Sequence, residues 1–234
     1  MTAIEGVIFD KDGTLFDFSR TWEAWAKGFL LRIAHTEDLA RTIGQAIGFD
    51  VDTGKFEAGS VVIAGTPGEI AEVMKASLPT MAASDIVSIM NEEAAKAPQV
   101  EAAELHPLLD RLKSFGLALG VVTNDAEEPA MAHLRSAGVQ HHFDFVAGFD
   151  SGFGSKPQPG QLFAFLDHTG VEASRCVMVG DSTHDLLAGR QAGMWCVGVL
   201  TGLAEESVLS PHADVVLPDI GHLPEWLKQL NALN

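Results

Sequence analysis

Short apolar runs alternate with longer amphipathic segments along most of the chain. The runs are rich in valine and other strand-favouring residues and are bounded by turn residues, as is typical of buried strands. The predicted strands cover residues 6–9, 117–122, 144–148, 176–179, 196–200 and 214–217. The predicted helices cover residues 107–114, 127–137, 159–169 and 183–192, with a last one from about residue 223. This alternation predicts βαβ units, and hence an α/β fold with a parallel sheet.

Residues 17–100 interrupt the alternation with almost only helical signals. Trp22, Trp25 and Phe29 share one helical face, which suits either the core of a helical unit or the wall of a ligand pocket. Further helix starts are predicted at Thr36, Thr66 and Ser84. We therefore expect an α/β core formed by residues 1–16 and 105–234, and an α-helical insert formed by residues 17–104.

Two carboxylates stand at the end of the first predicted strand, in the sequence Asp10-Lys11-Asp12-Gly13-Thr14. Strand alternation places Asp10 and Asp12 on one side, and Gly13 allows a sharp turn after them. An Asp-Gly-Thr sequence is also ordinary turn chemistry. Two carboxylates at the mouth of a strand nevertheless suit a divalent cation, or a pair made of a nucleophile and an acid/base. Lys11 is expected to point away from both acids.

Three later segments place polar residues at comparable positions. The strand that ends at Val122 is followed by Thr123 and Asn124, a lone Lys156 precedes a helix, and Asp181 and Asp185 follow the strand at 176–179. Taken singly, a threonine and an asparagine after a strand predict a turn, and a lone lysine in a loop predicts a solvated side chain. Their order along the chain is what favours a common site. Ligands of open α/β sheets bind where strands end.

These four segments, in this order, resemble the motifs of the haloacid dehalogenase superfamily on its phosphatase branch. The resemblance covers about residues 4–220. It implies a Rossmann-like core with an inserted α-helical cap. The cap of that superfamily stands at the position of the helical insert described above. In its cap type and from Lys156 to Val199 the chain is similar to the phosphoglycolate phosphatase group, which makes 2-phosphoglycolate a possible substrate.

The resemblance also implies a mechanism. It makes Asp10 the nucleophile that forms an aspartyl-phosphate, and Asp12 the general acid/base. It assigns Mg²⁺ binding to Asp10, Asp12 (through its backbone carbonyl) and Asp181, and to Asp185 through a metal-bound water, with Asp185 also pairing with Lys156. It assigns binding of the transferred phosphoryl group to Thr123, Asn124 and Lys156.

Other reactions of the superfamily remain as alternatives. Phosphosugar mutases keep all four motifs and are the main catalytic alternative. Dehalogenases lack the second acid and the metal, and phosphonate hydrolases replace the second acid, so Asp12 argues against both. A binding protein without activity on this fold is a further alternative, and hydrolysis of a generic phosphate ester would exclude it. His184 lies within the last motif and could approach the substrate, whereas His141 and His142 are expected at the surface.

Composition narrows the class of partner. The net charge of −17 argues against nucleic acid, which needs basic surface. An anionic substrate then needs a local positive pocket, supplied by Mg²⁺, Lys156 and helix N-terminal amides. No apolar run approaches the ~18 residues of a membrane span, and the first strand begins too early for a signal peptide. The two cysteines suit buried free thiols. We expect a cytoplasmic enzyme, monomeric or homodimeric, that acts on a small phosphorylated metabolite without contacting a membrane.

Overall fold

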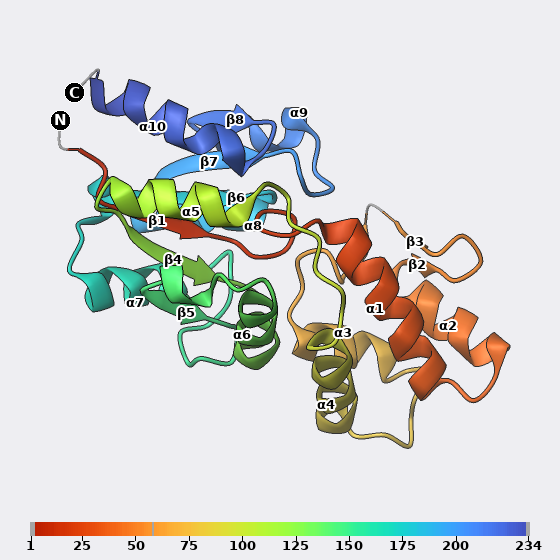
Figure 1. The fold of residues 1–234 in the computed structure, drawn as a ribbon. Coiled ribbons are helices and arrows are strands. Elements are labelled where there is room, and N and C mark those ends of the chain that lie inside the picture. Colours follow the sequence, from red (N-terminus) through yellow and green to blue (C-terminus); the bar gives the residue numbers. More distant parts are fainter. Residues whose placement is uncertain (1–2, 58, 233–234) are drawn as a thin grey trace.

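A six-stranded, wholly parallel sheet forms the centre of the larger part of the molecule (Figure 1). The computed structural model describes residues 3–57 and 59–232. In sheet order, the strands are β5 (Phe145–Ala147), β4 (Ala118–Val122), β1 (Gly6–Phe9), β6 (Cys176–Gly180), β7 (Trp195–Val199) and β8 (Val215–Leu217). The predicted α/β fold with a parallel sheet is confirmed, and the predicted strands agree with these to within one residue at each end.

Helices cover both faces of this sheet. They are α5 (Leu105–Ser114), α6 (Glu127–Ser136), α7 (Gly160–Thr169), α8 (Thr183–Ala192), α9 (Glu206–Leu209) and α10 (Leu223–Ala232). Because side chains alternate along a strand, Val7 and Phe9 pack into the apolar cluster that includes α5 and α10, whereas Ile8 packs with α7 and α8.

The segment between β1 and α5 forms a separate helical layer with its own apolar cluster, beside the carboxyl ends of the strands (Figure 1). Its elements are α1 (Phe18–Ile33), α2 (Glu37–Ile47), β2 (Phe49–Asp50), β3 (Lys55–Phe56), α3 (Pro67–Met74) and α4 (Ala83–Ala94). The helix start predicted at Thr66 is confirmed, because Thr66 and Glu69 form a capping box that opens α3. Residues 49–56 depart from the predicted helical pattern of this segment, because Gly48 and Gly54, both at positive φ, end α2 and turn the chain into a short antiparallel hairpin.

Two connecting segments run side by side where the helical layer joins the sheet. The Asp17 amide donates to the Val100 carbonyl at 2.8 Å, and the Ala102 amide donates to the Leu15 carbonyl at 2.9 Å. These contacts lie at or next to residues 16–18 and 97–104, near which the sequence predicts hinges, and a hinge motion there stays a prediction. Within the described residues, no helix is long and apolar enough to cross a membrane.

Candidate active site

The ends of three adjacent strands place the first functional side chains together. Asp10 follows β1, Thr123 follows β4 and Asp181 follows β6, and β1 lies between the other two strands in parallel register. Since parallel strands end at one edge of a sheet, residues far apart in sequence meet there.

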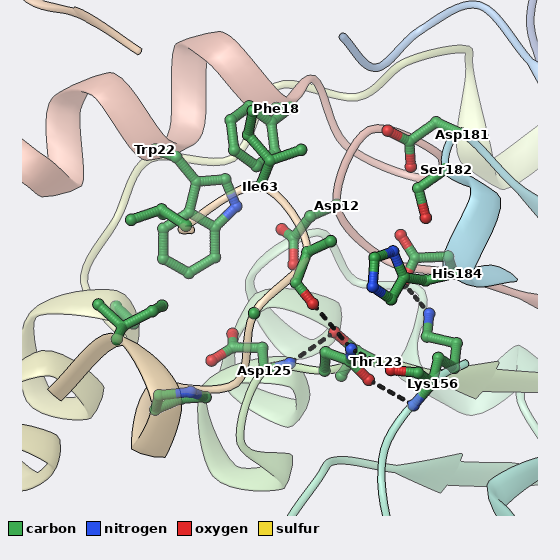
Figure 2. A pocket seen from close by; sticks show the side chains of 18 of the residues that line it. Asp12, Phe18, Trp22, Ile63, Thr123, Asp125, Lys156, Asp181, Ser182 and His184 are labelled. Carbon is green, nitrogen blue, oxygen red and sulfur yellow. Dashed lines mark hydrogen bonds and ion pairs between the residues drawn. The ribbon is translucent and has the colours of Figure 1, made fainter. Parts of the chain in front are cut away.

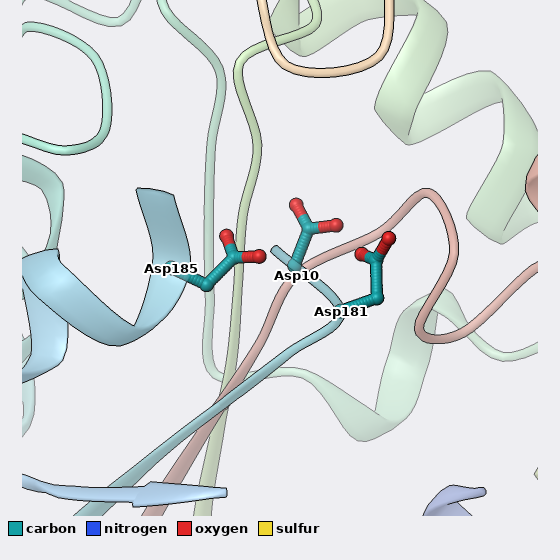
Figure 3. Close-up of side chains that lie close together, drawn as sticks. All are labelled: Asp10, Asp181 and Asp185. Atoms are coloured by element: carbon teal, nitrogen blue, oxygen red, sulfur yellow. The ribbon is translucent and has the colours of Figure 1, made fainter. Parts of the chain in front are cut away.

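Three buried carboxylates form the centre of this edge (Figure 3). Asp10, Asp181 and Asp185 each place a carboxylate oxygen within 4.8 Å of the other two. Asp185 stands in the first turn of α8 because Ser182 caps that helix, and its Oδ2 accepts from the Ser182 amide at 3.0 Å. Gly13 and Gly202 lie against Asp181, and a Cβ at either position would collide with its carboxylate.

Lys156 neutralises two of these acids. Its Nζ lies 2.5 Å from Asp10 Oδ1 and 2.7 Å from Asp185 Oδ1, and it also donates to the Val122 carbonyl. Burial alone would lower the lysine pKa, but the two carboxylates raise it above its ordinary value, so the cation persists. The lysine is therefore a buried ion-pair partner and not a solvated loop residue, and the expected contact with Asp185 is present.

Two of the three acids have pKa values above that of a free aspartic acid. Burial raises the pKa of Asp10 to about 7, against the opposing effect of Lys156, and Asp185 and Asp12 add to the rise. Burial, together with Asp10 and Asp185, also raises the pKa of Asp181 well above its usual range. Within the described residues, Asp181 has no lysine or arginine in ion-pair contact; its contact is Thr14 Oγ1 at 3.4 Å. A clustered set of oxygen ligands with uncompensated negative charge suits a hard divalent cation such as Mg²⁺.

Asp12 is not part of this cluster, because its side chain binds Lys11. The Lys11 Nζ lies 2.8 Å from Asp12 Oδ2 and 3.1 Å from Asp125 Oδ2, and the lysine is completely buried. The expectation that Lys11 points away from the acids is wrong. The chain turns back directly after Lys11, whose carbonyl accepts from the Leu15 and Phe16 amides, so strand alternation no longer applies at Asp12.

His133 completes the surroundings of Lys11 and connects them to the helical layer. Its Nδ1 lies 3.0 Å from Lys11 Nζ and its Nε2 lies 2.7 Å from the Ala94 carbonyl of α4. A carbonyl can only accept and an ammonium can only donate, so Nε2 carries the proton and Nδ1 accepts. Burial, with a smaller effect of Lys11, lowers the pKa of His133 to about 4 and keeps it neutral. Sequence reasoning missed this histidine and Asp125, since neither belongs to a recognisable spacing.

Thr123 and Asn124 lie at the same edge of the sheet but make different contacts. Thr123 is buried and its Oγ1 accepts from the Asp125 amide at 3.0 Å. The Asn124 side chain donates to the Ala64 and Lys156 carbonyls, each at 2.9 Å, and accepts from the Lys156 amide at 2.8 Å. Its side-chain amide thus joins the helical layer to the Lys156 loop.

A pocket of about 630 Å³, counting the space at its mouth, lies between the acids and the helical layer (Figure 2). Trp22 and Trp25 line it and also belong to the apolar cluster of the helical layer, so both interpretations of the aromatic face hold for them; Phe29 belongs to the cluster alone. His184 lines the pocket as well. His142 is buried against Asp110, so its expected place at the surface is wrong.

Comparison with known proteins assigns the family. A family model described as haloacid dehalogenase-like hydrolase matches residues 4–193. The chain belongs to this hydrolase family. A phosphoglycolate phosphatase from Rhodospirillum rubrum is 40% identical over 120 residues, which are 51% of this chain and 50% of that protein. One from Yersinia pestis is 28% identical over 229 residues, 94% of this chain and 92% of that protein.

Solved structures agree on the fold. A haloacid dehalogenase-like hydrolase from Bacteroides fragilis superimposes with a TM-score of 0.72 at 21% identity, covering 94% of this chain and 99% of that one. At this identity the likeness concerns the fold. The chain spans only about half the length of the first curated relative that it matches, so the names of such relatives suggest activities for testing.

Proposed function

We propose that this protein is a Mg²⁺-dependent phosphatase that hydrolyses the phosphate monoester of a small metabolite through an aspartyl-phosphate on Asp10. The observation that carries the proposal is the position of Asp10, buried between Lys156 and two further carboxylates at the carboxyl edge of the sheet. A carboxylate can attack a phosphate dianion only where nearby positive charge offsets their repulsion.

The donor set fits the proposed metal. Asp10, Asp181, Asp185 and the Asp12 backbone carbonyl would hold Mg²⁺, and burial, together with the charges of Asp10 and Asp185, raises the pKa of Asp181 against the opposing effect of Lys156. When bound, the ion neutralises negative charge on the nucleophile and on the phosphoryl group. Lys156 supplies a second positive charge beside Asp10.

Asp10 and Asp12 divide the remaining chemistry. An Asp10 oxygen attacks phosphorus, the bond to the leaving oxygen breaks, and Asp12 gives that oxygen its proton. Water then attacks the phosphorus of the aspartyl-phosphate, Asp12 takes its proton, and phosphate and free Asp10 are produced. Asp12 is suited to this exchange, because its side chain lines the pocket and keeps 13% exposure, while Lys11 contacts both of its oxygens and fixes its position. The Thr123 hydroxyl and the Asn124 backbone amide are proposed to bind phosphoryl oxygens.

Residues 17–104 are proposed to act as the cap that covers this site, and the relatives' name makes 2-phosphoglycolate the first metabolite to test. A covered pocket favours small molecules over phosphorylated proteins. Cys176 and Cys196 are buried free thiols, which supports a cytoplasmic location.

The test is phosphate release from p-nitrophenyl phosphate and from a panel of metabolite esters. Activity should vanish in excess EDTA and return with Mg²⁺. Asp10→Asn, with the fold checked by circular dichroism, should retain less than about 1% of the activity, because loss of a nucleophile costs orders of magnitude. Full activity in EDTA or in the variant would contradict the mechanism. Phosphosugar mutase assays run alongside distinguish that alternative, and hydrolysis itself excludes a binding protein without activity.

A further inference from the structure

The pocket has two chemically different walls. The wall formed by the sheet holds the carboxylates and Lys156, whereas the wall formed by residues 18–94 is mostly apolar. Phe18, Trp22 and Trp25 of α1, Ile63, Ile70 of α3 and Met90 of α4 make up most of this second wall. Since the phosphate must lie against Asp10, the remainder of a bound ester faces the apolar wall (Figure 2).

Cations are scarce where the remainder of the ester would lie. Among the described residues, the apolar wall contributes no lysine, arginine or histidine to the pocket. Lys11 lies behind Trp22, 5.3 Å from its ring centroid, but Asp12 and Asp125 already neutralise it. Lys156 forms ion pairs with Asp10 and Asp185, and His184 belongs to the wall formed by the sheet. A carboxylate or second phosphate placed against the apolar wall would therefore be buried without a counter-charge, which is strongly unfavourable.

Two polar atoms of this wall lack partners. Trp22 Nε1, on a side chain that is only 8% exposed, has no hydrogen-bond partner in the described part of the chain, and neither has the buried Oδ1 of Asn91. Figure 2 shows the Trp22 nitrogen on the ring edge towards Asp12. By contrast, Trp25 Nε1 donates to the Met90 carbonyl at 3.2 Å. Buried polar atoms are almost always paired in native proteins, so an unpaired donor and an unpaired acceptor in one pocket point to a ligand that supplies both functions.

We propose that the substrate of this site is the phosphate ester of a compact, uncharged alcohol whose leaving group bears a hydroxyl that accepts from Trp22 and donates to Asn91. A hydroxyl satisfies both atoms without introducing charge, and its hydrocarbon part contacts the aromatic rings. The inference rests on the proposed phosphatase activity and disfavours 2-phosphoglycolate, whose carboxylate would face the apolar wall.

The experiment compares kcat/KM within pairs of esters that differ in one group. 2-Hydroxyethyl phosphate and 2-phosphoglycolate differ by a hydroxymethyl group in place of a carboxylate, as do glycerol 3-phosphate and 3-phosphoglycerate. The uncharged member of each pair should be preferred by about tenfold or more, because an unpaired buried charge costs more than one hydrogen bond. Equal turnover, or preference for the carboxylate members, would overturn the inference.

Variants test the two atoms. The ratio of kcat/KM for 2-hydroxyethyl phosphate to that for ethyl phosphate should fall towards one in Trp22→Phe and in Asn91→Leu. In the control variant Trp226→Phe, which removes an indole N–H of α10 outside the pocket lining, the ratio should stay that of the wild type. Asn91→Lys should raise relative turnover of 2-phosphoglycolate, since it supplies the missing cation. Unchanged ratios in both Trp22→Phe and Asn91→Leu would overturn the role of these residues.

p-Nitrophenyl phosphate separates the two proposals. If this ester is not hydrolysed with Mg²⁺, the proposed phosphatase fails and the inference fails with it. If it is hydrolysed while the carboxylate esters are preferred, or while none of the four metabolite esters is turned over, only the leaving-group inference is wrong.

Discussion

Lys11 shows how one buried side chain organises the edge of the site. It is enclosed by Asp12, Asp125, His133 and the Trp22 ring, and it contributes to the wall that separates the acids from the helical layer. Its pKa is raised, because the attraction of Asp12 and Asp125 outweighs burial, which alone would lower it. The lysine thus stays charged and contacts both oxygens of Asp12, Oδ1 at 2.9 Å and Oδ2 at 2.8 Å.

Replacement of Lys11 tests this role. Lys11→Met keeps most of the volume but leaves two carboxylates without their cation, and breaking a buried pair typically costs about 3–5 kcal/mol. The free energy of unfolding from urea titration measures the effect. Lys55→Met is the matched control, because the lysine of its ion pair with Glu23 is exposed to solvent. Loss of that pair should lower the free energy of unfolding by at most about 1 kcal/mol. Equal losses in the two variants would show that Lys11 is not the ion-pair centre described here.

The raised pKa of Asp10 predicts that metal binding depends on pH. A ligand carboxylate must be deprotonated to bind, and an acid with a pKa of about 7 is mostly protonated at pH 6 and ionised at pH 8. Mg²⁺ affinity should therefore be about tenfold weaker at pH 6 than at pH 8, with proton release on binding at the lower pH. Calorimetric titrations in two buffers of different ionisation enthalpy measure both quantities. Affinity independent of pH would show that Asp10 is already ionised in the metal-free protein.

At the scale of elements, the site depends on contacts between helices that belong to different layers. His133 of α6 hydrogen-bonds the last turn of α4, and Asn124 after β4 hydrogen-bonds Ala64 in the loop before α3. Both contacts use backbone carbonyls of the helical layer. As contacts with the backbone, they do not depend on which side chains stand at positions 64 and 94.

The contact of His133 predicts an acid-dependent loss of stability. In the folded protein its pKa is about 4, whereas in the unfolded chain it is about 6.5, so the unfolded state binds more protons between these values. Stability from this group is complete above pH 6.5 and declines as the pH falls towards 4. Relative to His133→Asn, the wild type should lose about 2 kcal/mol between pH 7 and pH 5. Urea titrations of both proteins at the two pH values measure the difference, and parallel behaviour would exclude a buried neutral histidine.

At the scale of the whole molecule, a protein of large negative net charge contains a pocket in which Lys156, together with Mg²⁺ when it is bound, supplies positive charge. The net charge of −17 repels a phosphate dianion at long range, and screening by salt weakens that repulsion. We expect kcat/KM for p-nitrophenyl phosphate to stay constant or to rise by up to about twofold between 20 and 200 mM NaCl at fixed Mg²⁺. Stopped-time phosphate assays across this range measure the dependence. A steep fall with salt would mean that a positive surface steers the substrate.

The sequence alone determined the order of the elements and the positions of the main acids. The apolar runs that end in Asp10, Thr123 and Asp181 predict where these residues lie, because parallel pairing brings the ends of such strands to one edge of the sheet. The capping pattern of Thr66 and Glu69 is equally local. The hairpin at 49–56 escaped prediction because its strands are only two residues long and carry too little alternation to be detected.

Only the tertiary structure decided which side chains meet across the two layers. Lys11 and His133 are 122 residues apart, and their contact depends on how α4 packs against α6. The unpaired atoms of Trp22 and Asn91 come from α1 and α4, and no spacing in the sequence indicates that both face one pocket. Local patterns encode strand ends and helix caps, because these arise from neighbouring residues. The chemistry of a pocket wall arises from packing between distant segments, and so it became readable only in the folded molecule.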